Sequence, residues 1–114
     1  MINHRNEMKT EIKEKLRSGN GQVHFTYLVD CSKEKNVTLL SELTLQPGSS
    51  IGYHSHDTNV EYYLILSGSG IVNDNGIDAP VKAGDTVITK DGASHSITNN
   101  GNEPLVFIAV IVNN

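Results

Sequence analysis

The sequence predicts an all-β protein, a single-domain antiparallel β-barrel with a short N-terminal helix. Three observations carry this prediction: a length of 114 residues, a series of short β-rich runs after residue 21, and turn residues between those runs. Because domains commonly contain about 100 to 150 residues, one core suffices. We expect a helical segment over residues 1–20 and the barrel over residues 21–114.

The predicted helix covers residues 7–17. Met8, Ile12 and Leu16 are spaced four apart, so on a helix they would form one apolar stripe that ends before Gly19. An isolated helix of this length is marginally stable. We therefore expect the stripe to dock on the barrel of its own chain or on a partner subunit.

Nine β-rich runs follow the predicted helix. Turn residues separate them, including an Asn-Gly pair at residues 75–76 that is typical of a two-residue hairpin. Such spacing is typical of an antiparallel barrel or sandwich. The runs cover residues 22–29, 37–45, 51–56, 60–67, 69–73, 77–82, 85–89, 94–98 and 105–112.

The last run is apolar at every position from Leu105 to Val112. A strand of this kind needs cover on both faces. Together with the apolar run from Tyr62 to Leu66, it indicates either a second sheet layer or a dimer interface. We predict a homodimer.

The charge pattern argues against nucleic acid as a partner. The formal net charge is -4, and only Lys82 and Lys90 are basic after residue 36, whereas duplex binding needs a basic face. No apolar run approaches the roughly 20 residues that cross a bilayer, and the N-terminus lacks the apolar stretch of a secretory signal. We expect no membrane partner and a cytoplasmic protein, and the single cysteine, Cys31, agrees with a reducing compartment.

Three histidines and one glutamate have the pattern of a metal site. His54 and His56 are two residues apart, so on a strand both imidazoles point to the same face, which in a barrel is the interior. Glu61 opens the next run after a short turn, and an antiparallel return brings its carboxylate beside them. His95 comes from a separate strand. We predict that these four residues bind one ion.

Three neutral imidazoles and one carboxylate suit a borderline divalent transition metal. Four protein ligands leave one or two positions of an octahedral shell open for water or substrate. Open positions are typical of catalytic rather than structural sites. The pattern therefore favours a metal site that engages a small molecule.

The spacing of these residues resembles the two sequence motifs of the cupin superfamily. In the first, five residues follow Gly48, then come His54-Ser55-His56, four residues, Glu61, six residues and Gly68. The second begins at Gly84 and contains, at matching spacings, Gly92, His95 and Asn99. The one departure is Lys90, where the family usually has proline, and it affects a turn residue and no ligand.

The resemblance implies a double-stranded β-helix, or jelly roll, in which His54, His56, Glu61 and His95 are the metal ligands. Cupins typically bind manganese, iron, nickel, zinc or copper, and many form dimers through their N-terminal strands. Because the fold hosts oxygenases, decarboxylases, isomerases and non-catalytic binding proteins, the reaction does not follow from it.

Strand alternation predicts the pocket around the metal. Tyr63, Ile65 and Ser67 share the parity of Glu61, and Ile97 shares that of His95, which gives a mostly apolar wall with one phenol. Such a wall favours a small organic molecule. Tyr63 is a candidate proton donor, against the alternative of plain packing.

The two arginines, Arg5 and Arg17, both lie in the N-terminal segment. The barrel therefore has no guanidinium of its own for a dicarboxylate, which weakens an oxalate-type reaction. Such a reaction would require binding by the metal alone or an N-terminal segment that reaches the site of another subunit.

The other titratable candidates have ordinary explanations. His24 lies on the first strand, and alternation leaves open whether it or its neighbours face the pocket, although a role in the site is the less favoured alternative. Glu42 and Asp57 could act as bases, but such carboxylates are usually solvated. No catalytic residue is assigned.

Three functions remain open. The first is a metal-dependent enzyme acting on a small organic substrate, of the oxygenase, decarboxylase or isomerase type. The alternative is a non-catalytic metal-containing module that binds or senses a small molecule. The third is a structural role in which the metal only stabilises the fold.

Overall fold

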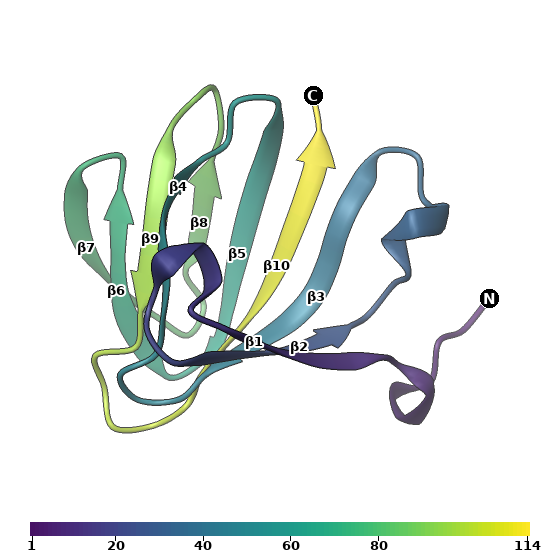
Figure 1. Ribbon diagram of the computed structural model, residues 1–114, viewed down its shortest axis with the longest axis horizontal. Coiled ribbons are helices and arrows are strands. Elements are labelled where there is room, and N and C mark those ends of the chain that lie inside the picture. The colour runs from purple at the N-terminus through teal and green to yellow at the C-terminus, as the bar shows by residue number, and fades with distance from the viewer.

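The computed structural model describes residues 1–114, and β-strands dominate it (Figure 1). The strands are β1 (Thr10–Glu14), β2 (Gln22–Tyr27), β3 (Val37–Leu45), β4 (Ser50–Ser55), β5 (Asn59–Ser67), β6 (Ser69–Asp74), β7 (Ile77–Lys82), β8 (Thr86–Thr89), β9 (Ser94–Thr98) and β10 (Leu105–Asn113). Three short 3-10 turns connect them: η1 (Arg5–Glu7), η2 (Leu16–Ser18) and η3 (Cys31–Lys33).

The strands form two antiparallel sheets that face each other. The larger sheet has the order β1-β2-β3-β10-β5-β8, and the smaller has the order β4-β9-β6-β7. All nine predicted runs are strands, with bounds within two residues of those expected. The all-β jelly roll is therefore confirmed.

The sheets do not close into a continuous barrel. No ladder joins β4, an edge strand of the smaller sheet, to the larger sheet. Instead, the turn between β1 and β2 packs on β4, where the Ser50 N–H donates to the carbonyl oxygen of Asn20 at 2.9 Å. The expected closed barrel is thus corrected to two facing sheets, one edge of which is covered by a turn.

The predicted N-terminal helix is wrong. Residues 10–14 pair with β2 in a regular ladder, in which Glu11 lies opposite Phe25 and Ile12 opposite His24. Pairing on an existing strand satisfies backbone groups that a short isolated helix leaves open. The charged side chains also stabilise the pairing of β1 with β2, because the Lys13 ammonium lies 4.9 Å from the centre of the Phe25 ring.

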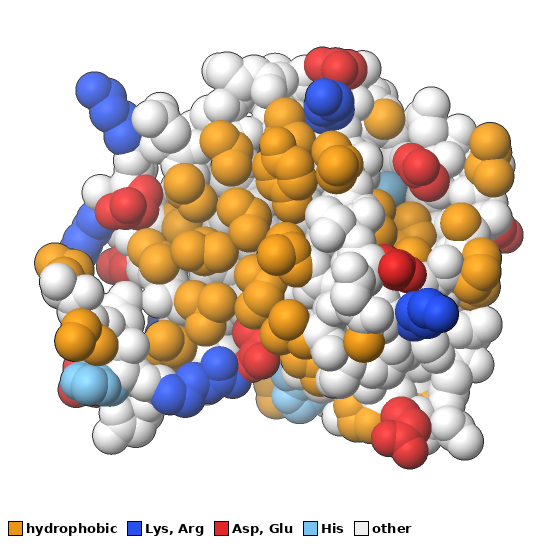
Figure 2. Space-filling view, turned by 180° about the vertical axis from the view of Figure 1, so that it is seen from behind, with side chains coloured by type: hydrophobic (Ala, Val, Ile, Leu, Met, Phe, Trp, Pro, Cys, Tyr) orange, Lys and Arg blue, Asp and Glu red, His pale blue; other side chains and the backbone are white.

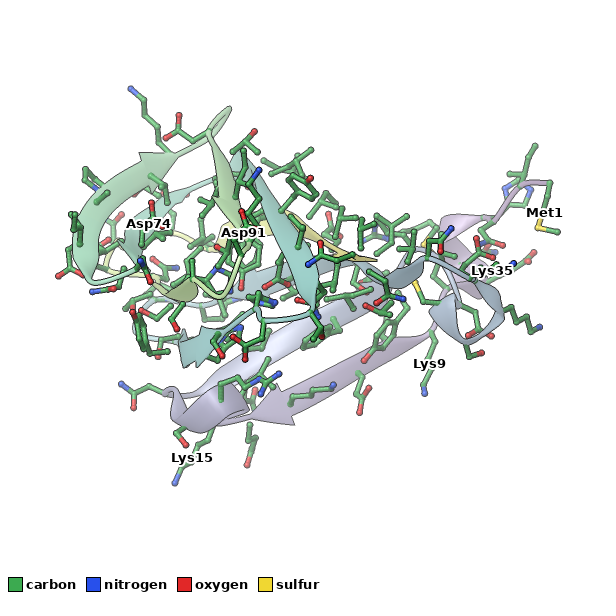
Figure 3. All side chains as sticks on the ribbon, turned by 90° about the horizontal axis from the view of Figure 1, so that it is seen from above. Met1, Lys9, Lys15, Lys35, Asp74 and Asp91 are labelled. Carbon is green, nitrogen blue, oxygen red and sulfur yellow. The ribbon has the colours of Figure 1, made fainter.

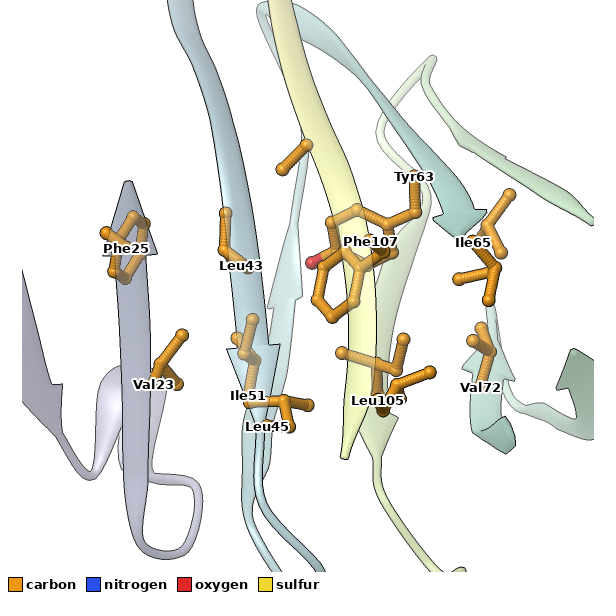
Figure 4. Close-up of a cluster of buried hydrophobic side chains, with 13 residues drawn as sticks. Val23, Phe25, Leu43, Leu45, Ile51, Tyr63, Ile65, Val72, Leu105 and Phe107 are labelled. Atoms are coloured by element: carbon orange, nitrogen blue, oxygen red, sulfur yellow. The ribbon is translucent and has the colours of Figure 1, made fainter. Parts of the chain in front are cut away.

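The core lies between the two sheets (Figure 4). Val23 and Phe25 of β2, Leu43 of β3 and Phe107 of β10 all point into it, and each is at least 95% buried. The large aromatic side chains Tyr63 and Phe107 pack against each other with ring centres 4.7 Å apart. Strand alternation therefore gives one well-packed inner face.

The other face of β10 is only half-buried, although both faces were expected to be covered. Leu105, Phe107 and Ala109 are buried, whereas Val106 and Ile108 alternate with them and are partly exposed. A view from behind shows hydrophobic side chains gathered in the middle of the molecule (Figure 2). The structure contains no helix with the length and hydropathy needed to span a membrane.

Candidate metal centre

The β4–β9 ladder brings two of the four predicted ligands together. His54 lies directly opposite His95 in the register of these strands. His56 follows the end of β4, where its N–H donates to the carbonyl oxygen of Ala93 and its carbonyl accepts from the Gly92 N–H, both at 3.0 Å. The turn before β9 therefore fixes the position of His56.

Glu61 comes from the other sheet. It lies on β5 opposite Thr89 of β8, and only 4% of it is exposed. Strand alternation turns its carboxylate toward the smaller sheet, as it does the side chains of Tyr63 and Ile65. The four residues thus meet between the sheets, as the sequence predicted.

Their donor atoms converge on one point. The His95 Nε2 atom lies 3.1 Å from the Nε2 atoms of both His54 and His56 and 2.9 Å from Oε1 of Glu61. The same carboxylate oxygen is 3.0 Å from His56 Nε2 and 3.9 Å from His54 Nε2. All four donor atoms lie within 4.8 Å of one another, so the group could hold a metal ion.

These separations fit the coordination shell of a transition metal. With metal–nitrogen bonds of about 2.0 to 2.1 Å, adjacent ligands of an octahedral ion lie about 3 Å apart and opposite ones about 4 Å apart. The pairs at 2.9 to 3.1 Å correspond to adjacent ligands. The His54–Glu61 pair, at 3.9 Å, corresponds to opposite ones.

Each imidazole is held through its other nitrogen. The Nδ1 atom of His54 lies 2.7 Å from the carbonyl oxygen of Gly52, and that of His56 lies 2.6 Å from Oδ1 of Asn59. Nδ1 of His95 lies 2.8 Å from the Thr89 hydroxyl. The oxygens at His54 and His56 are acceptors, which favours a proton on Nδ1 and leaves the Nε2 lone pair free to bind a metal, and the Thr89 hydroxyl can accept from His95 in the same way.

The resulting cluster combines three Nε2 lone pairs with one carboxylate. Such electron-rich atoms repel one another at 3 Å unless a cation lies among them, either a metal ion or shared protons. The donor set therefore fits a divalent ion on its own chemistry.

Sequence reasoning missed the two side chains that hold His56 and His95. Asn59 was interpreted only as a turn residue, although it shares the parity of Glu61 on β5. Thr89 shares the inward parity of Val87 on β8 and is 1% exposed. Parity identifies both as inward-facing, but only the hydrogen bonds of the folded chain show which histidine each one contacts.

Burial and hydrogen bonding shift the pKa values of this cluster in different directions. Burial favours the neutral form of Glu61, but hydrogen bonds with the three imidazoles outweigh it and hold its pKa well below the usual range. The bond to Glu61 raises the pKa of His56. Burial lowers the pKa of His95. Glu61 therefore stays ionised, as a metal ligand must.

Tyr63 forms part of the wall beside the cluster. Its hydroxyl lies 3.5 Å from His95 Nε2, and the two rings stack with centres 4.9 Å apart. Burial, followed by the charge of Glu61, raises the pKa of Tyr63 well above its usual value, so that the phenol keeps its proton. Ile65 and Ile97 are also buried, as expected, whereas Ser67 is exposed.

The remaining candidates lie outside the cluster. His24 is on the outward face of β2, because its neighbours Val23 and Phe25 are the buried ones. Glu42 pairs with Arg5. Asp57 is exposed and accepts from the Ser55 hydroxyl at 3.1 Å. A surface hollow of about 550 Å³ lies elsewhere, between η1, the end of β2 and η3, and contains none of the four predicted ligands.

One turn of the N-terminal segment lies beside the smaller sheet. The turn that contains Arg17 packs against β4 of the same chain. The N-terminal segment therefore packs on a strand that carries one of the predicted ligands, His54, within a single chain.

Comparison with known proteins decides the family. The model of the cupin domain family matches residues 41–111, which include all four predicted ligands. The chain belongs to the cupin family. The fold of this family explains why a histidine pair, a glutamate and a distant histidine meet between two sheets.

A named protein and a crystal structure, both from Thermotoga maritima, resemble this cupin along its length. A protein named "Oxalate-binding protein" is 42% identical over 98% of this chain and 93% of its own. A crystal structure described as a predicted oxalate decarboxylase is 40% identical, covers 100% of both chains and superposes with a TM-score of 0.94. A polyketide cyclase from Streptomyces resistomycificus, 21% identical over 98% of this chain and 78% of its own, shares the fold with a TM-score of 0.76.

The last residue of the second motif has a structural role in this cupin. The buried Asn99 amide donates to the carbonyl oxygens of Leu45 and Glu103, both at 2.8 Å, and its side-chain oxygen accepts from the Gly101 N–H at 2.9 Å. These bonds tie the end of β3 to the loop before β10. The motif therefore combines a predicted metal ligand, His95, with a loop anchor.

Proposed function

We propose that this cupin holds one divalent transition-metal ion through His54, His56, Glu61 and His95 and acts as a metal-dependent enzyme on a small organic acid. The observation that carries this proposal is the convergence of four donor atoms, three of them on imidazoles held at Nδ1. A purely structural metal would not need the open positions that four ligands leave in an octahedral shell.

A divalent ion at this site supplies a Lewis acid that polarises a bound carboxylate or carbonyl oxygen. The residues of the chain supply the rest. Tyr63 keeps its proton, so its phenol can donate a hydrogen bond or a proton beside His95. The apolar side chains of Ile65 and Ile97 exclude water from the inner side of the site. Glu61 stays ionised.

The printed names support a small dicarboxylate, with oxalate as the first candidate. The relative is named for binding oxalate, and the crystal structure is described as that of a predicted oxalate decarboxylase. Decarboxylation would convert hydrogen oxalate into carbon dioxide and formate, with no change in the total number of atoms or electrons. The alternative is a module that binds the dicarboxylate without turnover, which the name of the first relative favours.

One experiment separates these functions. The protein would be loaded separately with manganese, iron, nickel, zinc or copper and incubated with carbon-13 oxalate at neutral pH. Nuclear magnetic resonance then follows oxalate and formate, and calorimetry measures binding. Metal-dependent formate production supports the enzyme, and metal-dependent binding without product supports the binding module. If oxalate is neither bound nor consumed with any of these metals, both the enzyme and the binding module are overturned.

A further inference from the structure

Ser41 carries a buried hydroxyl group that has no hydrogen-bond partner in the chain. It is the fifth of the nine residues of β3 and is 0% exposed. The inward residues around it on the same strand, Leu39, Leu43 and Leu45, are all apolar and belong to the core or pack against it. Burial of an unpaired hydroxyl costs free energy that an alanine at this position would not. A serine here therefore points to a partner that the chain itself does not supply.

Strand register places Ser41 in one row with Tyr63. Ser41 lies opposite Ala109 of β10, and Ala109 lies opposite Tyr63 of β5. All three side chains are at most 2% exposed, so they point to the inner face of the larger sheet. The row thus has a hydroxyl group at each end and only a methyl group between them.

Tyr63 connects this row to the candidate metal centre. Its hydroxyl oxygen lies 3.5 Å from Nε2 of His95. Figure 4 shows the Tyr63 side chain lying across β10, with its hydroxyl oxygen on the side of β3. Glu61, another predicted ligand, belongs to the neighbouring row, in which it lies opposite Ile111 of β10. Ser41 and Glu61 are therefore on the same inner face, on strands that only β10 separates.

Ser41 is enclosed in the same way as the candidate metal centre. Its strand begins just after Lys35, which lies at the same end of the molecule as Met1, and runs from there toward the middle (Figure 3). Three of the predicted ligands are, like Ser41, almost entirely buried, with exposed fractions of at most 4%: His56, Glu61 and His95. A ligand bound at the proposed ion would therefore be enclosed between the sheets, where an unpaired hydroxyl group can contact it.

We propose that the hydroxyl group of Ser41 binds an oxygen atom of the organic acid that the proposed ion leaves free, and so favours dicarboxylates over monocarboxylates. A serine hydroxyl can donate one hydrogen bond and accept others. Its bond to a carboxylate is stronger than a bond between two neutral groups. Ala109 places no larger side chain between Ser41 and Tyr63 in their row. This inference rests on the proposed function and adds a residue that determines its substrate class.

Calorimetry on manganese-loaded protein tests the role of Ser41. Oxalate and acetate would be titrated into the wild type, Ser41→Ala and the control Ser67→Ala, whose serine is exposed at the end of β5. Loss of a hydrogen bond to a carboxylate should weaken oxalate binding about 10- to 100-fold in Ser41→Ala. Acetate has no second carboxylate and should bind all three proteins alike, and Ser67→Ala should bind oxalate as the wild type does.

Stability measurements separate a contact with the ligand from a structural role. Because the hydroxyl of Ser41 has no partner in the chain, its removal should leave the manganese content unchanged. The melting temperature measured with chelator should stay the same or rise. A lower melting temperature or a loss of manganese in Ser41→Ala would overturn the inference, because the hydroxyl would then stabilise the fold or the metal site itself.

The outcomes of the titrations also distinguish this inference from the proposed function. If the wild type binds oxalate and Ser41→Ala binds it equally well, the role of Ser41 is overturned and the proposed function stands. An equal loss of oxalate and acetate binding in Ser41→Ala would also overturn it, because the residue would then act by shaping the site. If the wild type itself binds no oxalate, the proposed dicarboxylate function fails, and the ligand assigned to Ser41 fails with it.

Discussion

At the scale of single residues, the chemistry of the site depends on what lies behind each imidazole. Gly52, Asn59 and Thr89 each provide an oxygen to one Nδ1 atom, and the first two favour the tautomer whose Nε2 atom is free to bind a metal. The backbone carbonyl and the amide oxygen can only accept. Thr89 is the one hydroxyl among the three, and it holds the most buried of the histidines, His95.

Replacing Thr89 with valine should therefore weaken the metal site and leave the fold intact. The shape is kept, but the partner of His95 Nδ1 is lost, and loss of such outer partners typically lowers metal affinity about 10- to 100-fold. Competition with a chelator of known affinity measures the change. Thr86→Val, at an exposed position of the same strand, is the control and should bind metal as the wild type does.

Acid should destabilise the metal-loaded protein more steeply than the metal-free protein. Ligation requires neutral imidazoles, so protons compete for all three histidines as the pH falls from about 7 to 5. Metal binds only the folded chain, and its release should lower the melting temperature cooperatively. Parallel melting curves with metal and with chelator over this interval would show that metal is not coupled to these histidines.

The metal-free protein should respond weakly over the same interval, because two shifts oppose each other. Because the pKa of His95 is lower in the folded protein than in the unfolded chain, His95 contributes stability above pH 6.5 that is lost as the pH falls. The raised pKa of His56 contributes stability that is fully present below 6.5 and is lost as the pH rises. The lowered pKa of Glu61 adds stability above 4.5 that is lost only in stronger acid.

The residues that could be predicted are those whose role follows from strand alternation and spacing. His54, His56 and Glu61 come together because their parity and the intervening turn require it, and His95 because its motif spacing matches. The close approach of the Arg17 carbonyl to Gly52 of β4 could not be predicted in this way. It depends on a left-handed turn and on the missing Cβ of Gly52, neither of which leaves a periodic signal in the sequence.

At the scale of elements, the N-terminal segment shows how a sequence pattern can mislead. The i, i+4 spacing of Met8, Ile12 and Leu16 suggested a helical stripe, yet Ile12 is 55% exposed and only Leu16 packs against the core. Alternation of Lys9, Glu11 and Lys13 was the better signal. These three side chains, Lys9 just before β1 and the other two on it, lie against the aromatic residues of β2, where the Tyr27 hydroxyl donates to Glu11 at 2.6 Å.

The packing of the β1–β2 turn on β4 can be tested through glycine. Gly52→Ala would place a methyl group against the Arg17 carbonyl, and overpacking of this kind typically costs about 1 to 3 kcal/mol. The melting temperature measured with chelator should fall by about 4 to 20 °C. Gly101→Ala is the control, since its added Cβ would meet nothing closer than 3.4 Å. An unchanged melting temperature in Gly52→Ala would mean that the turn does not pack as described.

At the scale of the whole molecule, one sheet carries an apolar surface that this chain leaves partly open. Leu64 and Leu66 of β5 and Ile88 of β8 are 41%, 50% and 52% exposed, and the outward residues of β10 lie beside them. The sequence predicted that this region needs cover, and Figure 2 shows hydrophobic side chains gathered in one area. A monomer rarely exposes such a patch.

We therefore predict a homodimer that buries this face. Light scattering at micromolar concentration should give twice the mass of the chain. Leu64→Glu should give a monomer, because the change introduces a charge into the patch, while Ile77→Glu, at an exposed position of β7 outside the patch, should remain dimeric. A wild-type monomer mass at this concentration would contradict the prediction.

The most direct test of the metal centre is the metal content of matched histidine variants. Wild type, His95→Ala and His24→Ala would be freed of metal, exposed to the same limiting manganese or zinc, washed and analysed by elemental mass spectrometry. We predict that the wild type and His24→Ala, whose imidazole lies on the outward face of β2, take up the limiting metal equally and reach one ion per chain when the metal is in excess. His95→Ala should retain far less. Equal metal content in the two variants would contradict the assignment of His95 and, with it, the proposed centre.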